Sequence, residues 1–268
     1  MSLTIDHQKC IGCGACVSDC LQKCLALEDG LAVQVQNTCN ACGHCVAICP
    51  AGAVAIPDCE MDLVEELRPE DMQMDPVHLQ RFMSGRRSIR QFQNRSVERE
   101  KLEAILETGR MTPTSSNRQN LRFVVLQDKL PELREMAVEA LGENADEIAA
   151  QLGASRYRDK LLWIREELHR GNDRLFFEAP AVIVVIERGG SVVNGALAAS
   201  RMELMAVAQG LGVCFNGFFV WAASVDPRIP EALGCGEQDN IVTTLAVGYP
   251  DVNYCRTAPR KKLRVSWL

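Results

Sequence analysis

One pattern of four cysteines occurs twice near the N-terminus of this chain. Its two copies are, in order, Cys10, Cys13, Cys16 and Cys20, then Cys39, Cys42, Cys45 and Cys49, with every member displaced by 29 residues. The apolar framework repeats with the same displacement, because residues 25–27 (Leu-Ala-Leu) correspond to residues 54–56 (Val-Ala-Ile). A repeat of ligand-type residues together with apolar ones indicates one structural unit built twice.

The spacing in each copy is C-x2-C-x2-C-x3-C. Three thiolates two residues apart fit a loop wrapped around one corner of an iron–sulfur cube, and the fourth ligand comes from elsewhere in the chain. Gly12, Gly14 and Gly43 allow the tight backbone turns that such a loop needs. Zinc is the alternative metal, but four tetrahedral ligands per ion gain nothing from a third cysteine at this spacing.

The pattern resembles that of the bacterial ferredoxins with two [4Fe–4S] clusters, and the resemblance covers residues 1–57. In that family the last cysteine of each run binds the other cluster. The resemblance therefore implies two ligand sets, which are Cys10, Cys13, Cys16 and Cys49 for one cluster, and Cys39, Cys42, Cys45 and Cys20 for the other. Leu21 departs from the family, which usually has a proline after the fourth cysteine, whereas Pro50 keeps it.

Composition narrows the class of protein. Thirteen cysteines without an export signal indicate metal or redox chemistry rather than disulfides, and therefore a cytoplasmic protein. The net charge of −6 argues against a nucleic-acid partner, and no apolar stretch reaches the length of a membrane span. We expect Cys24 and Cys214 to be small buried residues, Cys214 rather than a catalytic thiol, and assign no role to Cys59, Cys235 or Cys255.

An acidic, Met-rich connector over residues 58–75 separates the cysteine module from a second domain at 76–268. The pattern of that domain predicts an α+β fold. Helices are expected over about 76–83, 131–141, 145–170 and 196–209. A further helix is expected to begin after an N-cap at Ser96. Strands are expected over 121–126, 181–186, 213–219 and 241–247.

Neither a Rossmann glycine fingerprint nor a Walker loop occurs in the second domain. Instead, four separated segments resemble the nitroreductase family and follow its order. They are Arg86-Arg87-Ser88-Ile89-Arg90, then the loop Pro113–Asn120, then Gln209–Gly217, and finally Gly248-Tyr249-Pro250 followed by the basic run Arg260-Lys261-Lys262. Asn120 and Leu121 replace the Pro-Trp pair that usually ends the second segment.

The resemblance implies that these segments bind FMN. Guanidinium groups and a hydroxyl suit the phosphate and ribityl chain, a side-chain amide suits the flavin ring edge, and a glycine permits close approach of the backbone. By position in the family, the cofactor-binding residues are Arg86, Arg87, Ser88, Arg90, Asn117, Gln119, Asn216, Gly217, Arg260 and Lys262. The family fold is an α+β sandwich with a mixed sheet flanked by helices, and it forms a homodimer with FMN contacted by both chains.

The fusion of the two modules predicts an oxidoreductase that passes electrons from a one-electron donor through two [4Fe–4S] clusters to FMN and a small acceptor, such as a nitroaromatic or a quinone. NAD(P)H is the other candidate donor. The alternative is an electron-transfer protein that serves a redox partner and has no small-molecule substrate. We identify no catalytic acid or base. Tyr157, Trp163, Phe176 and Phe177 are candidate substrate walls, although core packing is the simpler interpretation of each.

Overall fold

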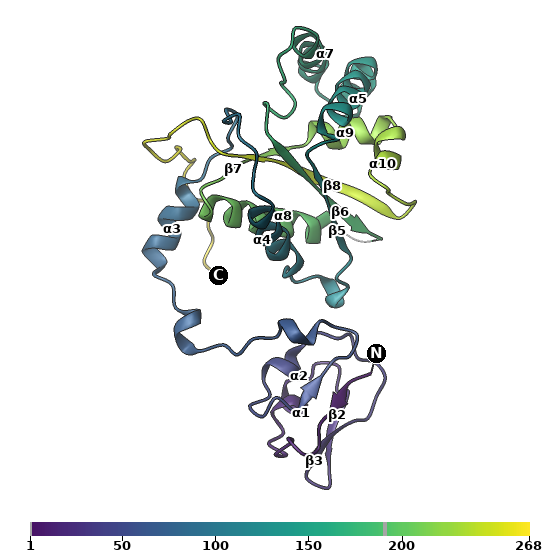
Figure 1. The fold of residues 1–268 in the computed structure, drawn as a ribbon, viewed down its shortest axis with the longest axis vertical. Helices are drawn as coiled ribbons and strands as arrows, with labels where there is room; N and C mark the ends of the chain where they lie inside the picture. Colours follow the sequence, from purple (N-terminus) through teal and green to yellow (C-terminus); the bar gives the residue numbers. More distant parts are fainter. Residues whose placement is uncertain (1, 190–191) are drawn as a thin grey trace. The chain divides into compact units, whose positions relative to one another are not determined.

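The computed structural model describes residues 2–189 and 192–268 and divides the chain into two compact units (Figure 1). The first contains the residues up to Gln73 together with Thr114–Arg118, and the second contains Met74–Pro113 and Gln119–Leu268. The division at Gln73 falls inside the predicted connector, but the segment Thr114–Arg118 was expected in the second domain. In the described part of the chain, no helix has the length and apolar character needed to cross a membrane.

The first unit shows the sequence repeat as paired elements. Helices α1 (Ala15–Asp19) and α2 (His44–Ala47) correspond under the displacement of 29 residues. Strands β1 (Thr4–Ile5) and β4 (Val54–Ala55) pair antiparallel, and so do β2 (Leu25–Glu28) and β3 (Leu31–Gln34). The displacement maps β1 into β3 and β2 onto β4, so each two-stranded sheet joins a strand of one half to a strand of the other.

Left-handed backbone conformations repeat as well. Gly12 and Ala41 have φ of 64° and 53°, Gly14 and Gly43 have 72° and 78°, and Lys23 and Gly52 have 54° and 56°. Each pair is separated by 29 residues. The left-handed region is costly for residues with a side chain, so three such matches indicate that the two halves follow the same path.

A four-stranded antiparallel sheet forms the centre of the second unit, in the order β5-β6-β8-β7. Its strands are β5 (Leu121–Leu126), β6 (Ala181–Arg188), β7 (Gly212–Asn216) and β8 (Asp239–Gly248). We predicted a mixed sheet, but all three pairs formed by these four strands are antiparallel, so this prediction was wrong. Parallel pairing is limited to a bridge between Ser88 and Val213, beside β7.

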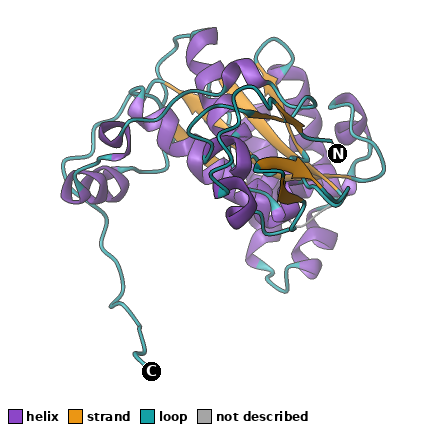
Figure 2. Cartoon of the chain, turned by 90° about the horizontal axis from the view of Figure 1, so that it is seen from below, coloured by secondary structure: helices purple, strands orange, loops and turns teal. Residues whose placement is uncertain are grey.

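Helices cover both faces of this sheet (Figures 1 and 2). Val182, Val184 and Ile186 of β6 belong to the apolar core on one face, and Ala181, Ile183 and Val185 belong to the core on the other. Complete burial of these six side chains confirms the expectation of a strand covered on both sides. The first face carries α5 (Leu130–Glu143), α6 (Ala145–Gln151), α7 (Arg156–His169), α9 (Phe218–Val225) and α10 (Arg228–Ala232); the second carries α4 (Arg99–Arg110) and α8 (Val192–Ala208).

Helix α3 (Pro76–Gly85) follows the connector, which contains short 3₁₀ turns at Met61–Leu63 and Pro69–Met72. The carboxylate of Asp75 accepts hydrogen bonds from the backbone N–H groups of Val77 and His78, as expected for an N-cap before a proline. None of the residues of α3 is buried. Its apolar side chains therefore find no core within the described chain.

Three local predictions need correction. Helix α4 begins at Arg99 with Glu98 as its N-cap, so Ser96 does not cap it. The predicted helix 145–170 is two helices, because Gly153 adopts a φ of 61° between them. The predicted strand 213–219 ends at Asn216, whose side-chain oxygen accepts hydrogen bonds from the N–H groups of Phe218 and Phe219 and starts α9 instead.

Candidate functional site

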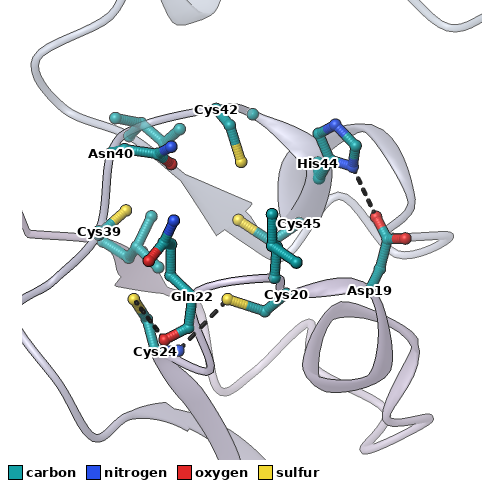
Figure 3. A pocket seen from close by; sticks show the side chains of 13 residues that line it. Asp19, Cys20, Gln22, Cys24, Cys39, Asn40, Cys42, His44 and Cys45 are labelled. Atoms are coloured by element: carbon teal, nitrogen blue, oxygen red, sulfur yellow. Dashed lines mark hydrogen bonds and ion pairs between the residues drawn. The ribbon is translucent and has the colours of Figure 1, made fainter. Parts of the chain in front are cut away.

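A cavity of about 350 Å³ in the first unit is lined by five cysteines, of which Cys24 is not a predicted ligand. The other four are Cys39, Cys42 and Cys45 from the second half of the repeat and Cys20 from the first half. Figure 3 shows their sulfur atoms around a common space, with Asp19 and His44 at one side. The ring Nδ1 of His44 lies 3.0 Å from a carboxylate oxygen of Asp19. This is the ligand set predicted for the second cluster.

The other four predicted ligands line a second, narrower cavity of about 20 Å³. Here Cys10, Cys13 and Cys16 come from the first half and Cys49 from the second half, next to Gly12 and Gly14. Cys13 is exposed, whereas Cys16 is buried. Both cavities thus combine three cysteines of one run with the last cysteine of the other, as the ferredoxin pattern implies.

Backbone N–H groups donate to the sulfur atoms of Cys20 and Cys49, the two cysteines that each line the cavity formed mainly by the other half of the repeat. The N–H of Cys24 lies 3.3 Å from Sγ of Cys20, and the N–H of Ala53 lies 3.3 Å from Sγ of Cys49. These two hydrogen bonds are related by the repeat, and the N–H of Ala41 donates similarly to Cys39 at 3.3 Å. Hydrogen bonds to ligand sulfurs stabilise thiolates and tune the potentials of iron–sulfur sites.

Across residues 2–189 and 192–268, no three His, Cys, Asp or Glu side chains come close enough together to hold a single metal ion. Burial raises the pKa of Cys16, and it raises the pKa of Cys45 to about 11.

In the second unit, the first and third of the four segments lie side by side. Ser88 bridges Val213 in parallel, and the N–H of Ile89 donates to the carbonyl of Val213 at 3.0 Å. Gly212 permits this approach, because a Cβ there would lie 2.4 Å from the side chain of Ile89. The parallel alignment directs the chain after Ser88 along β7 toward Asn216 and Gly217, at the end of that strand.

The start of the fourth segment borders the same stretch of chain. Phe92 forms an antiparallel bridge with Pro250, and the N–H of Gln93 donates to the carbonyl of Tyr249 at 2.9 Å. A Cβ on Gly248 would lie 2.9 Å from Phe92, so the small residue is required there. Residues 86–93 therefore run between β7 and the turn at 248–250. The structure brings three of the four segments together.

The arginines of the first segment have different surroundings. Nη1 of Arg86 lies 2.7 Å from a carboxylate oxygen of Glu203 in α8, whose side chain is only 6% exposed. The guanidinium of Arg87 lies 5.8 Å from the ring centre of Tyr254. The guanidinium of Arg90 lies 5.8 Å from the ring centre of Phe177. Arg86 thus has a buried anionic partner, whereas Arg87 and Arg90 contact aromatic rings at this edge.

Burial shifts the pKa values of two groups beside these arginines. It raises the pKa of the Glu203 carboxyl, although the charge of Arg86 opposes the shift. Burial also raises the pKa of the Cys214 thiol, against an opposing effect of Arg90. Cys214 is 3% exposed in β7, which agrees with the expectation of a small buried residue rather than a nucleophile.

Asn216 and Gly217 stand at the start of α9. The side-chain oxygen of Asn216 caps that helix, and its Nδ2 donates to the carbonyl of Leu175. Its side chain is therefore committed to the protein, which leaves the backbone of this turn as the part able to face a ligand. A Cβ on Gly217 would meet no atom within 4 Å, so the space in front of it is open.

The second segment is placed elsewhere. Nδ2 of Asn117 donates to the carbonyls of Asn40 and Ala41, at 3.3 and 2.7 Å, inside the first unit. Gln119, with a φ of 47°, precedes β5, where Leu121 pairs with Glu187. That end of the sheet is opposite to the end where Gly212 pairs with Gly248 beside the first segment. Within one chain, Gln119 and Ser88 therefore lie at opposite ends of the sheet.

Arg260 and Lys262 lie in the segment after β8, which has no regular structure from residue 252 onward and is exposed throughout 259–268. Figure 2 shows this segment leading away from the helices to the C-terminus. Among the described residues, no hydrogen bond or ion pair joins Arg260 or Lys262 to the first segment. Their predicted role at the flavin phosphate stays a prediction.

The candidate substrate walls divide into core and surface. Phe176 is fully buried against Phe219, so it is core. Tyr157 packs edge-on against Trp221 with ring centres 5.2 Å apart. Trp163 is 37% exposed and Phe177 is half-buried, so these two have accessible ring surface. Phe177 also has a positive φ of 62°, which is rare for an aromatic residue.

Two residues that contact the arginines of the first segment were not predicted from the sequence. Glu203 is a buried acid in α8, and an acid inside the run Ala-Ala-Ser-Arg-Met-Glu-Leu-Met was the available signal. Tyr254 packs near Arg87, but nothing in its local sequence distinguishes it from any exposed tyrosine.

Comparison with known proteins identifies the second unit. Residues 83–249 match the model of the nitroreductase family. An iodotyrosine deiodinase from Haliscomenobacter hydrossis is 33% identical over 63 residues, which is 24% of this chain and 28% of that relative. The chain thus covers far less than two thirds of this curated relative.

Solved structures share the fold at low sequence identity. A nitroreductase with bound FMN from Bacteroides fragilis is 20% identical with a TM-score of 0.57, and covers 72% of this chain and 100% of its own. A nitroreductase with bound FMN from Desulfitobacterium hafniense is 24% identical over 72% of this chain and 100% of its own, with a TM-score of 0.55. A BluB-like flavoprotein from Clostridium difficile is 20% identical over 71% and 96%, with a TM-score of 0.53. These matches confirm the α+β fold predicted from the four segments.

Proposed function

Because this chain belongs to the nitroreductase family, we propose that it is an FMN-dependent oxidoreductase whose flavin receives electrons through two [4Fe–4S] clusters in the first unit. The observation that carries the proposal is the lining of the two cavities. Each contains three cysteines of one run and the fourth cysteine of the other, with matching N–H donors to the crossing sulfurs. This is the ligand pattern of two-cluster ferredoxins.

Binding of FMN is supported by the solved relatives that contain it and by the arrangement of residues 86–93. Arg87, Ser88 and Arg90 stand beside β7 and supply the cationic and hydroxyl donors that a phosphate and a ribityl chain require. The open space before Gly217 leaves room for a flat ring against the backbone. When bound, FMN supplies chemistry in steps of one or two electrons.

A homodimer explains the residues that one chain leaves apart. Gln119 lies at the opposite end of the sheet from Ser88, and the segment with Arg260 and Lys262 is exposed. Helix α3 also exposes apolar side chains, with Val77 at 55%, Leu79 at 40% and Met83 at 49%. A second copy that buried this helix would contribute the missing residues to a shared FMN site.

The proposal is tested by analysing anaerobically purified full-length protein for iron, acid-labile sulfide and FMN. We expect about eight irons and eight sulfides per chain, and one FMN. Reduced holoprotein should then be reoxidised catalytically by a nitroaromatic or a quinone. Stoichiometric zinc with little sulfide would refute the clusters. Tight binding to another redox protein without turnover of any small acceptor would favour an electron-transfer protein instead.

The flavin site has its own test in the C-terminal basic run. A charge-assisted contact to a phosphate is worth about 1.5–3 kcal/mol, so Lys262→Ala should weaken FMN binding roughly tenfold to hundredfold. Lys261→Ala is the matched control, because it removes the same charge from the neighbouring exposed position. Fluorescence titration of the apoprotein with FMN measures both. Equal effects of the two substitutions would show that Lys262 has no specific contact.

A further inference from the structure

Three cationic side chains lie at the accessible aromatic rings of the second unit. Nζ of Lys160 lies 3.8 Å from the ring centre of Trp163, in the same helix α7. The guanidinium of Arg174 lies 5.8 Å from that ring centre, and the guanidinium of Arg90 lies 5.8 Å from the ring centre of Phe177. Trp163 and Phe177 are the two candidate substrate walls with accessible ring surface. Lys160, Arg174 and Arg90, here called the cation group, therefore border the surface that a substrate could use.

The members of the cation group are close enough together to repel one another. Partial burial lowers the pKa of Lys160, and the positive charges of Arg174 and Arg90 lower it further. A positive charge is destabilised by other positive charges nearby, and an anion that binds between them offsets the repulsion. The arrangement therefore suits an anionic ligand.

The protein supplies little negative charge to this group. Glu167 is the acid beside it, with a carboxylate oxygen 3.4 Å from Nε of Arg174. The same carboxylate also lies 2.9 Å from Nη1 of Arg170, so its charge is shared between two arginines. In the part of the chain that the structure describes, neither Lys160 nor Arg90 forms an ion pair with a carboxylate. Positive charge is therefore in excess at these rings.

The cation group also borders the proposed flavin site. The carbonyl of Leu175, next to Arg174, accepts a hydrogen bond from Nδ2 of Asn216 at the end of β7. Arg90 belongs to the segment that runs beside β7, and its guanidinium interacts with the thiol of Cys214 in that strand. A molecule held by the cation group would therefore lie next to the open turn that follows Asn216.

We propose that the electron acceptor is a planar aromatic molecule with an anionic group such as a carboxylate, held by Lys160 and Arg174 with its ring against Trp163; the inference rests on the proposed function. The two cations donate charge-assisted hydrogen bonds to the anionic group. The exposed part of the indole packs against the ring of the acceptor. An uncharged acceptor of the same shape makes only the second of these contacts and binds more weakly.

The test compares 4-nitrobenzoate with 4-nitrobenzamide, which has nearly the same shape but no charge. Isothermal titration calorimetry of the oxidised full-length holoprotein measures the binding of each compound. We expect the nitrobenzoate to bind about fivefold to twentyfold more tightly, since each partly exposed ion pair contributes up to about fivefold. Lys160→Gln and Arg174→Gln should each reduce this preference, and together they should abolish it. Arg156→Gln should retain it and is the matched control, because Arg156 is an exposed cation of the same helix that lies over Tyr157 instead.

Reoxidation of the reduced holoprotein separates this inference from the proposed function. Protein reduced anaerobically and freed of excess dithionite should be reoxidised faster by low concentrations of 4-nitrobenzoate than of 4-nitrobenzamide. Equal binding and equal rates with the two compounds would refute the anionic preference while the oxidoreductase stands. Loss of the preference in Arg156→Gln to the same extent as in Lys160→Gln would also refute it, because the general charge of the surface would then explain it. If neither nitro compound nor a quinone reoxidises the wild type, the proposed function fails and this inference fails with it.

Discussion

At the scale of single residues, the structure gives Arg86 a partner that the sequence did not predict. The family pattern assigns it to a flavin phosphate, and the structure pairs it with the nearly buried carboxylate of Glu203. A guanidinium offers five donors, so the two roles are compatible. They differ in what its removal would do. One role affects the binding of FMN and the other affects the stability of the fold.

Arg86→Ala separates these roles when combined with Glu203→Gln. Alone, Arg86→Ala leaves a buried charge without its partner, and we expect a loss of about 3 kcal/mol in the free energy of unfolding. The double substitution removes that charge and should recover most of the loss. If Arg86 also binds phosphate, the recovered double variant still binds FMN about tenfold more weakly. Urea denaturation and FMN titration measure the two effects. Full recovery of both would leave Arg86 a structural role alone.

Glu203 also makes stability depend on pH. Burial raises its pKa in the folded state above the unfolded value, so the folded chain binds a proton that the unfolded chain releases. Its contribution is therefore fully present below the unfolded pKa and is lost as pH rises through the folded pKa. The stability of the wild type relative to Glu203→Gln should fall as pH rises, and urea denaturation at several pH values measures this difference. A difference that stays constant or grows with pH contradicts the assignment.

At the scale of elements, the two repeated cysteine loops have the same backbone conformation but differ in where they require glycine. Gly12 and Ala41 occupy equivalent left-handed positions, so this backbone conformation alone does not require glycine. Gly12 has another constraint. A Cβ there would lie 1.9 Å from the carbonyl oxygen of Gly30, in the turn between β2 and β3. The close approach of that hairpin explains the glycine.

Gly12→Ala and Gly43→Ala form a matched pair. Both glycines have positive φ, but a Cβ on Gly43 would meet nothing within 4 Å. Gly43→Ala should cost about 1–2 kcal/mol for the left-handed conformation alone. Gly12→Ala must also displace the carbonyl of Gly30, which adds about 1–3 kcal/mol. Hydrogen exchange of peptides from β2 and β3 measures the loss of protection. Equal exchange in both variants would mean that the hairpin yields without cost.

The elements that the sequence predicted well were those with a strong local signal. The strand Leu121–Leu126 has its predicted bounds, and the β-branched run of β6 is buried on both faces. Predictions failed where a tertiary contact or one residue decided the outcome. The N-cap of Asn216 turns a predicted strand into α9, and Gly153 divides a long periodic stretch. Neither event changes the hydrophobic period that the sequence displays.

For the whole molecule, the cysteine repeat and the four segments together predicted two domains with different cofactors, which neither pattern would predict alone. The resemblance to two-cluster ferredoxins implied which cysteine of each run joins the other half, and the lining of each cavity includes that set of four cysteines. The flavin site was only partly predictable. Three segments meet beside β7, but Gln119 lies at the opposite end of the sheet, and Arg260 and Lys262 lie in an exposed segment without regular structure. The order of the motifs in the sequence does not indicate where each segment lies in the fold.

The fusion predicts the route of electrons through the molecule. Residues 1–60 contain six acidic residues against Lys9 and Lys23, so the cysteine module should attract a donor with a basic surface. The second unit has its own two cores on the faces of its sheet. A chain that begins at Met74 should therefore still fold and bind FMN, and dithionite should reduce it. It should lose most of the turnover driven by a one-electron protein donor, because the proposed entry point is missing.

Two measurements on the intact protein complete this test. Donor-driven rates should fall as salt is added, because exposed charges that guide association are screened beyond about 8–10 Å at physiological ionic strength. Cys13→Ser should lower the iron content and the donor-driven rate while FMN stays bound, since Cys13 belongs to the first unit. If the chain that begins at Met74 accepts electrons from the donor as fast as the full-length protein does, the clusters are not the relay. Their place in the molecule would then be structural or regulatory.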